Sequence, residues 1–131
     1  MPLSEGCTYW AYDLYHDLAE FLDAFWSLTA VDGHAEARDA IVDVPRERAD
    51  LAMVLKLLPC AEQMGRGLGL ALLDSLQAPR ILVTFPVASL GGRGKGMERH
   101  YQEEFLDMVS ARQWAVERHV FATELAFLIQ K

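Results

Sequence analysis

The sequence predicts an α/β fold with a mostly parallel sheet that ends in an antiparallel hairpin. Strand-like and helix-like segments alternate along residues 8–109, as in strands joined by crossover helices. Residues 49–56 form a nearly continuous apolar run of strand length, which is typical of a parallel strand covered on both faces. Residues 114–121 and 124–129 are strand-like and close enough in sequence to form an antiparallel hairpin.

The first third of the chain is predicted to hold two strands around one helix. Residues 8–13 (TYWAYD) are short, rich in aromatic side chains and end in an acid, which favours a buried strand. An amphipathic helix follows, because four apolar residues have the i, i+3, i+4, i+7 spacing of one helix face: Leu18, Phe21, Leu22 and Phe25. Asp32-Gly33 marks a turn, residues 34–38 form a weak strand, and a loop continues to Pro45.

The rest of the chain is predicted to repeat the alternation. Pro59 closes a turn after the run at 49–56, and Leu68, Leu72 and Leu76 form a second helical stripe. Pro79 stops that helix, and residues 81–85 (ILVTF) are a buried strand. A glycine-rich loop follows, and then a helix from about 98 to 109 that buries three residues: Tyr101, Phe105 and Met108.

Length and composition predict one globular domain. The chain has 131 residues, 52% hydrophobic and 24% charged, which excludes wholesale disorder. Cys7 and Cys60 are too few for a disulfide framework or a four-cysteine zinc site. With no secretory signal and no apolar stretch that could span a bilayer, we expect a cytoplasmic protein with free thiols.

Charge is divided unevenly along the chain. The formal net charge is −7, but residues 1–65 carry 12 acids and 4 bases, whereas residues 66–131 carry 7 acids and 8 bases. An acidic half repels a polyanion, so the chain is not expected to be a free-standing nucleic-acid binder. Any contact with RNA is expected at one basic loop, near Arg93, Lys95 and Arg99.

Two acids follow predicted strands, where parallel α/β sheets bind ligands. Asp13 ends the first strand, and a carboxylate at such a place matches the two hydroxyls of a ribose. It could equally cap the following helix. Asp39 could bind an adenine amino group, although on its own a role in a turn is favoured.

The segment 89–97 (SLGGRGKGM) is the most unusual part of the chain. Its four glycines allow close approach to a ligand, and Arg93 and Lys95 could hold RNA phosphates. The alternative is a solvated surface loop. The segment is neither a Walker A loop nor a G-x-G-x-x-G fingerprint, and the four histidines have no metal-ligand spacing.

This loop, in the wider segment 84–98 (TFPVASLGGRGKGME), resembles the signature loop of the aminoglycoside-resistance 16S ribosomal RNA methyltransferases, which modify guanine N7. The resemblance extends through residues 50–59 (DLAMVLKLLP) and 123–129 (TELAFLI), and covers nearly the whole chain from about Thr8 onward. It implies a Rossmann-like fold, S-adenosylmethionine as cofactor, and 16S rRNA of the small ribosomal subunit as partner.

Carried over by position, the resemblance implies a cofactor site and an RNA site. Asp13 would hold the ribose, Asp39 the adenine edge, and Leu55 with Lys56 the methyl-donor pocket. The full cofactor set is Asp13, Leu14, Asp39, Ala40, Leu55 and Lys56, and the RNA set is Ser89, Arg93, Lys95 and Arg99. No residue is required as a general acid or base, because guanine N7 carries a lone pair and no proton.

The chain also departs from the family. Ala88 and Tyr15 stand where family members usually carry a basic and a polar residue, and the chain begins after the family's first strand, its glycine-rich turn and the N-terminal helical domain. The expected protein is therefore a single, N-terminally truncated methyltransferase domain over residues 1–131. We expect the gap to be closed by direct pairing of the two flanking strands, or by self-association. The alternative functions are a non-catalytic RNA- or protein-interaction module and, less favoured, a generic nucleotide-binding domain.

Overall fold

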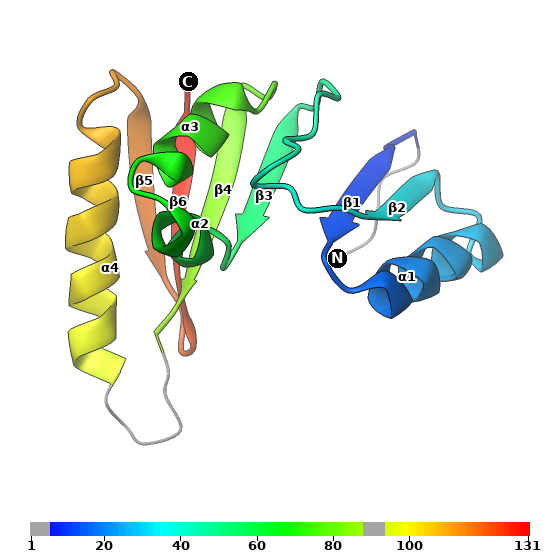
Figure 1. The fold of residues 1–131 in the computed structure, drawn as a ribbon, viewed down its shortest axis with the longest axis horizontal. Helices are drawn as coiled ribbons and strands as arrows, with labels where there is room; N and C mark the ends of the chain where they lie inside the picture. Colours follow the sequence, from blue (N-terminus) through cyan, green and yellow to red (C-terminus); the bar gives the residue numbers. More distant parts are fainter. Residues whose placement is uncertain (1–5, 88–93) are drawn as a thin grey trace. The chain divides into compact units, whose positions relative to one another are not determined.

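The structure is a computed structural model that describes residues 6–87 and 94–131 (Figure 1). Its residues form two compact units, Met1–Pro45 and Arg46–Lys131, hereafter unit 1 and unit 2. Each contains its own sheet, and the two are described separately below.

Unit 1 is a single strand–helix–strand element. Strands β1 (Tyr9–Asp13) and β2 (Gly33–Ala37) pair in parallel, with Tyr9 opposite Gly33 and Asp13 opposite Ala37. Helix α1 (His16–Leu28) is the crossover between them. These elements lie where the sequence predicted them, because the aromatic run and the helical spacing are local patterns.

The core of unit 1 centres on Trp26 of α1. Trp26 is buried and lies 6.1 Å from the ring of Tyr9, measured between centroids. Its indole ring covers Gly33 so closely that a Cβ atom at that position would lie 2.3 Å from it. A glycine is therefore required at the start of β2, not for a special backbone angle but for close packing.

Helix α1 buries a different face from the predicted apolar stripe. Ala19 and Trp26 are buried and Leu22 of the predicted stripe is half-buried, whereas Leu18, Phe21 and Phe25 are exposed. The helical period was correct, but the face that contacts the sheet is set by where the helix meets β1 and β2.

Unit 2 is a four-stranded sheet with three helices. Its strands, in the order β3-β4-β6-β5, are β3 (Leu51–Leu55), β4 (Arg80–Pro86), β5 (Ala115–Val120) and β6 (Glu124–Gln130). The β3–β4 pair is parallel, and β6 pairs antiparallel with both β4 and β5. The sheet is thus mixed, and the α/β fold with its C-terminal antiparallel hairpin is confirmed.

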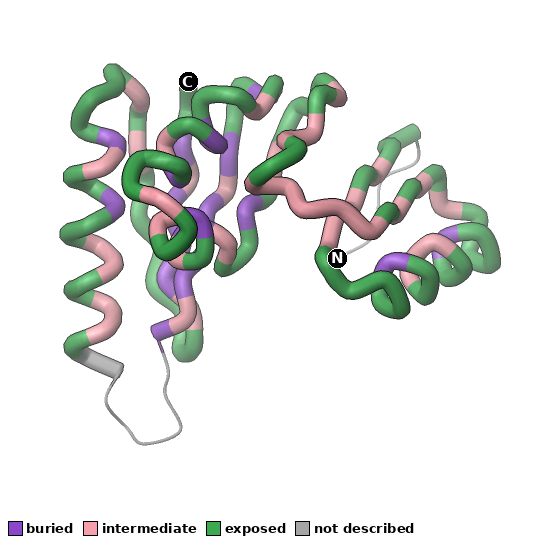
Figure 2. The backbone as a smooth tube through the Cα atoms, in the orientation of Figure 1, coloured by how far each residue is buried: buried purple, intermediate pink, exposed green. Residues whose placement is uncertain are grey.

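The core of unit 2 is concentrated on the two central strands, as Figure 2 shows by the burial of β4 and β6. Ile81, Val83 and Phe127 are fully buried there. The ring of Phe105 stacks on that of Phe127 at 4.4 Å between centroids, which anchors α4 (Gly94–Val109) to the sheet. These apolar residues account for the strand-like runs seen in the sequence.

Two predictions about unit 2 were wrong. Pro59 does not close a turn but occupies the first turn of a helix, α2 (Leu58–Met64), where its missing N–H costs no hydrogen bond. Gly65 and Gly67 then separate α2 from α3 (Leu68–Ser75), with Gly67 at a φ of +86°. Strand β3 is not covered on both faces, because Leu51, Met53 and Leu55 are exposed.

The direct pairing that was predicted between the strands ending at Asp13 and Lys56 is also absent from the part of the chain that the structure describes. There, β1 is hydrogen-bonded to β2 alone and β3 to β4 alone. Two sheets form instead of one, so β1 and β3 each have one edge that pairs with no strand among the described residues.

Candidate cofactor and RNA-binding site

Asp13 and Asp39 lie at the same edge of the unit 1 sheet. Asp13 ends β1, and Asp39 follows its partner strand β2 by two residues. The backbone N–H of Arg38 donates to the carbonyl of Asp13 at 2.9 Å, which holds the two strand ends together. This is the carboxyl edge of a parallel pair, where a ligand of such a sheet is expected.

Each acid uses one carboxylate oxygen to stabilise its own turn. Asp13 Oδ1 accepts from the N–H of Tyr15 at 2.9 Å. Asp39 Oδ1 accepts from the N–H groups of Ile41 at 3.1 Å and Val42 at 3.3 Å. The structural role that the sequence left open is therefore present for both acids. Neither Oδ2 has a hydrogen-bond partner among the described residues, so both remain available to a ligand.

The neighbouring residues of these acids differ in exposure. Leu14, after Asp13, is 68% exposed, and Ala40, after Asp39, is half-buried. An exposed leucine beside a carboxylate offers an apolar surface next to a hydrogen-bond acceptor. That combination suits the flat face and the polar edge of a nucleoside.

Lys56 lies at the carboxyl end of β3 in unit 2, in a conformation unusual for its residue type. Its φ is +56°, in the left-handed region that non-glycine residues rarely adopt. The backbone N–H of Lys56 donates to Thr84, with the carbonyl oxygen at 3.0 Å and Oγ1 at 3.2 Å. Thr84 is the buried polar residue of β4, so these bonds fix the turn at Lys56. Left-handed non-glycine residues cluster at functional sites.

The side chain of Lys56 is held by Glu124, which the sequence did not single out. Lys56 Nζ lies 2.8 Å from Glu124 Oε1. Glu124 begins β6 and is opposite Pro86 of β4, so the sheet brings it beside the end of β3. The only feature of the sequence that pointed to Glu124 was its position in segment 123–129, which is part of the resemblance to the family. The pairing of β4 with β6, which brings Glu124 beside Lys56, could not be predicted from the sequence. Leu55, the other predicted pocket residue, is exposed on β3.

The predicted RNA-binding residues lie on and before α4. Ser89 and Arg93 fall outside the described residues, and Lys95 belongs to the first turn of α4. Arg99 Nε donates to Glu103 Oε1 at 2.8 Å, and this carboxylate raises the pKa of the Arg99 guanidinium. Both side chains are exposed, so Arg99 can exchange this partner for another anion at little cost.

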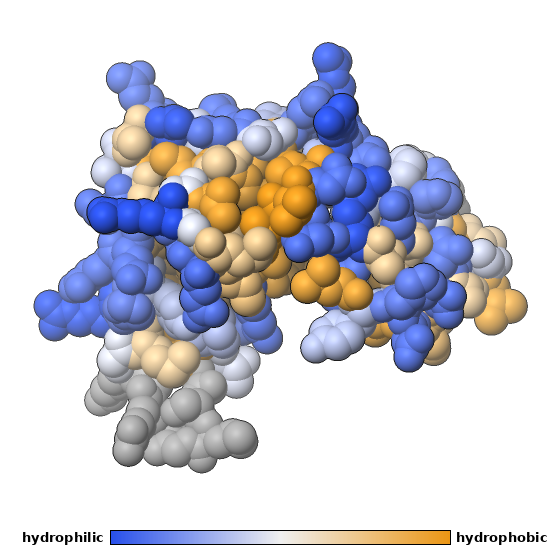
Figure 3. Space-filling model, viewed as in Figure 1, coloured by the Kyte–Doolittle hydropathy of each residue, from blue (hydrophilic) through white to orange (hydrophobic). Residues whose placement is uncertain are grey.

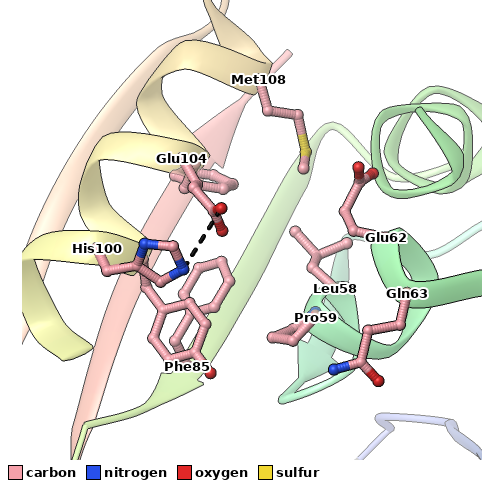
Figure 4. Close-up of a pocket in the computed structure, with 10 residues that line it drawn as sticks. Leu58, Pro59, Glu62, Gln63, Phe85, His100, Glu104 and Met108 are labelled. Atoms are coloured by element: carbon pink, nitrogen blue, oxygen red, sulfur yellow. Dashed lines mark ion pairs between the residues drawn. The ribbon is translucent and has the colours of Figure 1, made fainter. Parts of the chain in front are cut away.

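A cleft of about 290 Å³ lies between α2 and α4, above the end of β4 (Figure 4). The ring of Phe85 stacks on Tyr101 at 5.1 Å inside it. Its rim is acidic, since Glu104 pairs with His100 at 3.4 Å and Glu62 accepts from the N–H of Gly69 at 2.8 Å. Because Glu62 supports the start of α3, we assign this residue a structural role.

Among residues 6–87 and 94–131, no three His, Cys, Asp or Glu residues are grouped so that they could hold a metal ion. Among these same residues, no helix has both the length and the apolar character needed to cross a membrane.

The elements of the two units define the class of fold. Unit 1 is a parallel strand pair with a crossover helix, and unit 2 contains a parallel pair and a C-terminal antiparallel hairpin, which are elements of a Rossmann-like α/β fold. A SAM-dependent methyltransferase from Aquifex aeolicus shares this fold, with a TM-score of 0.66 at 11% identity over 95% of this chain.

The chain belongs to the FmrO ribosomal RNA methyltransferase family, whose model matches residues 1–128. It is 36% identical, over all of its length, to the 16S rRNA (guanine(1405)-N(7))-methyltransferase of Frankia casuarinae, and 38% identical over 93% of its length to the enzyme of that name from Serratia marcescens. The solved 16S rRNA methyltransferase RmtF, in complex with S-adenosyl-L-homocysteine, has a TM-score of 0.86 and 34% identity over 93% of this chain. The family predicted from the loop is thereby confirmed.

The chain spans about half the length of the curated relatives it matches: 46% of the Frankia relative and 49% of the Serratia relative. It likewise covers 47% of the RmtF chain. The predicted cofactor residues are divided between the two units, with Asp13, Leu14, Asp39 and Ala40 in unit 1 and Leu55 and Lys56 in unit 2.

Proposed function

We propose that this chain is the catalytic-domain portion of an enzyme that methylates guanine N7 of 16S rRNA, using S-adenosylmethionine. The observation that carries the proposal is the placement of Asp13, Asp39 and Lys56. Each lies at or just after the carboxyl end of a parallel strand, and each of the two acids has one carboxylate oxygen without a partner among the described residues. The names of the relatives supply the substrate class.

In this proposal the residues bind and align rather than transfer protons. Asp13 with Leu14 holds the ribose, Asp39 with Ala40 the adenine edge, and Leu55 with Lys56 the methyl-donor pocket. S-adenosylmethionine, when bound, supplies a methyl group on a positively charged sulfur. Guanine N7 has a lone pair and no proton, so alignment of the reacting atoms is the main requirement, and alignment can supply roughly 7–11 kcal/mol.

The RNA contact is proposed at the start of α4 and in the loop before it. Ser89, Arg93, Lys95 and Arg99 provide one hydroxyl and three cations within a segment that carries a single acid, Glu98. Unit 1, by contrast, has 9 acids and 1 base, which gives it a formal charge of −8 and repels phosphates. We therefore place the RNA of the small ribosomal subunit against unit 2.

Two further parts of the proposal concern the whole protein. Both units belong to one methyltransferase domain, and the enzyme acts in the cytoplasm, where it makes the ribosome resistant to aminoglycosides. Expression of the chain in a sensitive bacterium tests the resistance. It is expected to raise the inhibitory concentration of aminoglycosides but not that of other antibiotics. An unchanged inhibitory concentration despite methylated 16S rRNA would contradict it.

Calorimetry with S-adenosylmethionine tests the cofactor. The chain is expected to release or absorb measurable heat on titration, and Asp39→Ala to weaken that binding. An absence of heat at millimolar ligand would favour the alternative function, a non-catalytic interaction module.

Sedimentation with 30S subunits tests the RNA contact. Arg93→Ala with Lys95→Ala is expected to weaken association. It is also expected to reduce the slope of log affinity against log salt concentration by about one for each lost phosphate contact. Arg80→Ala, which removes an exposed base at the start of β4, is the matched control. Equal effects of the two variants would show that net charge, not the loop, governs association.

Self-association is proposed through the open edge of β3. Leu51, Met53 and Leu55 are between 45% and 58% exposed there, on a strand whose backbone pairs only with β4 among the described residues. Figure 3 shows apolar side chains gathered on the visible face of unit 2. Met53→Lys is expected to raise the monomer fraction in analytical ultracentrifugation, because a lysine protects an exposed edge. A monomer fraction that stays the same would locate the contact elsewhere.

A further inference from the structure

Glu98 is the only acid in residues 93–99, which the proposed function places against RNA. The same residues include three bases, Arg93, Lys95 and Arg99. A carboxylate among them opposes the binding of phosphates, because its charge acts over about 8 Å at physiological salt. Glu98 also lies beyond the first turn of α4, which contains no acid, so it gains little from the helix dipole. Its charge therefore bears on RNA binding more than on the stability of the helix.

Glu98 is paired with a base that is distant in the sequence. Arg118 Nη2, on β5, donates to Glu98 Oε1 at 2.6 Å. The two side chains are 44% and 32% exposed, and ion pairs this exposed contribute little to stability. The main physical effect of the pair is therefore that Arg118 neutralises the carboxylate of Glu98.

The packing of α4 on the C-terminal hairpin places Arg118 opposite Glu98 (Figure 1). Arg118 pairs directly with Phe127 of β6, and directly paired residues of antiparallel strands lie on the same face of a sheet. Phe127 stacks on Phe105 of α4, so this is the face that α4 covers. Glu98 precedes Phe105 by seven residues, or two helical turns, and lies on the same side of the helix. The ion pair thus follows from the packing of the core.

The bases next to Glu98 show why its partner matters. The guanidinium of Arg99 already donates to Glu103 at 2.8 Å, so an uncompensated Glu98 would be a second acid beside it. Lys95 precedes Glu98 by three residues, a spacing at which an acid and a base on a helix interact. Because Glu98 is bound to Arg118, its charge does not offset that of these two bases.

We propose that Arg118 is a positioning residue for the RNA contact. By holding and neutralising Glu98, it leaves the positive charge at the start of α4 available to RNA phosphates. Arg118 acts through Glu98 and is not itself a phosphate ligand. This inference rests on the proposed function, because it concerns the same RNA-binding surface.

A double-mutant cycle, measured by sedimentation of the full chain with 30S subunits, tests this role. Arg118→Gln is expected to weaken association roughly three- to tenfold at low salt, because it leaves the charge of Glu98 uncompensated, and less at high salt, which screens that charge. Adding Glu98→Gln is expected to restore association to within about twofold of wild type, since no carboxylate then remains to be neutralised. Glu98→Gln alone is expected not to weaken association.

Arg112→Gln is the matched control. It removes the same charge and breaks an ion pair of the same 2.6 Å length and similar exposure, with Asp74, beyond the other end of α4. We expect this variant to associate within about twofold of wild type, because its charge lies more than a Debye length from the start of the helix. Circular dichroism and thermal unfolding verify that each variant folds.

Three results would overturn the inference. Association unchanged by Arg118→Gln would show that Glu98 needs no neutralisation. A double variant as weak as Arg118→Gln would show that Arg118 binds phosphate itself or supports the fold. Equal weakening by Arg112→Gln would assign the effect to net charge.

Failure of the proposed function gives a different result. The wild-type chain would then not associate with 30S subunits, or Arg93→Ala with Lys95→Ala would leave association unchanged. The inference would fail with it, because the start of α4 would have no RNA contact for Arg118 to support. Association that depends on Arg93 and Lys95 but not on Arg118 would overturn the inference alone.

Discussion

At the scale of single residues, two kinds of site residue differ in what fixes them. Asp13 and Asp39 are fixed by their own turns, through hydrogen bonds to backbone N–H groups two or three residues later. Lys56 is fixed by residues distant in sequence, Thr84 and Glu124. A substitution at Asp13 or Asp39 can therefore change ligand binding without changing the fold. A substitution at Thr84 or Glu124 tests whether these distant residues position Lys56.

Asp13→Asn is expected to weaken S-adenosylmethionine binding at least tenfold while leaving thermal stability nearly unchanged. The amide keeps an oxygen to accept from Tyr15 N–H but replaces the second carboxylate oxygen by a donor. Loss of a hydrogen bond to a charged group costs about 1.5–3 kcal/mol. Calorimetry measures the affinity, and Asp17→Asn on α1 is the control. Unaltered affinity would leave Asp13 with its turn role alone.

Glu124→Gln is expected to weaken cofactor binding severalfold, because it releases the Lys56 ammonium from its 2.8 Å ion pair. The pair is partly exposed, so its loss lowers the free energy of unfolding by no more than about 1 kcal/mol. Glu103→Gln removes an ion pair of the same length, with Arg99, and is the matched control in calorimetry. If both variants bind equally well, Glu124 does not position Lys56 for the cofactor.

At the scale of elements, close packing decides which glycines matter. Gly33 is covered by the Trp26 ring, Gly67 has a positive φ, and Gly96 in α4 has open space around it. The three glycines are alike in the sequence, and only their surroundings separate them. Replacing Gly33 or Gly96 by alanine therefore has different expected outcomes.

Gly33→Ala is expected to lower the free energy of unfolding of unit 1 by about 1–3 kcal/mol, because the new methyl group displaces Trp26. Hydrogen exchange should become faster in β1 and α1 and stay unchanged in β4 and β6. Gly96→Ala is the control, and is expected to stabilise α4 by about 0.5–1 kcal/mol. Faster exchange in both units after Gly33→Ala would show that they unfold together.

At the scale of the whole molecule, the C-terminus is tied to the middle of the chain. Lys131 Nζ donates to the carbonyl of Leu76 at 2.7 Å, at the end of α3. Arg112, before β5, binds Asp74 with Nε at 2.9 Å and Nη2 at 2.6 Å. This bidentate bond holds the pKa of the Asp74 carboxyl below its usual range, mainly through the hydrogen bond and then through charge.

Asp74→Asn is expected to destabilise unit 2 by about 0.5–1 kcal/mol at neutral pH, since both side chains are more than a third exposed. A lowered pKa in the folded state gives stability that is present above the unfolded pKa, about 3.9 for Asp, and is lost as pH falls through the folded value. The difference between wild type and variant should therefore be constant from pH 5 to 8 and shrink below about pH 4. Urea unfolding measures it, and a constant difference down to pH 2 would contradict the assignment.

The sequence predicted most elements correctly because their signals are local. The aromatic run before Asp13, the apolar run of β3 and the hairpin at the C-terminus need no knowledge of distant residues. Helix α2 was missed because Pro59 is as compatible with a helix start as with a turn. The exposed face of α1 was assigned wrongly because two apolar stripes are present, and the spacing alone does not say which one meets the sheet.

By itself, the sequence determined the kinds of elements, the family and the acids at the strand ends, since each depends on neighbouring residues. Only the tertiary structure decided that β6 lies between β4 and β5, that Glu124 meets Lys56, and that β1 and β3 belong to separate sheets. The physical reason is that these outcomes depend on hydrogen bonds and packing between distant segments. The local propensities of a segment do not determine which strand edges pair with another strand and which remain unpaired.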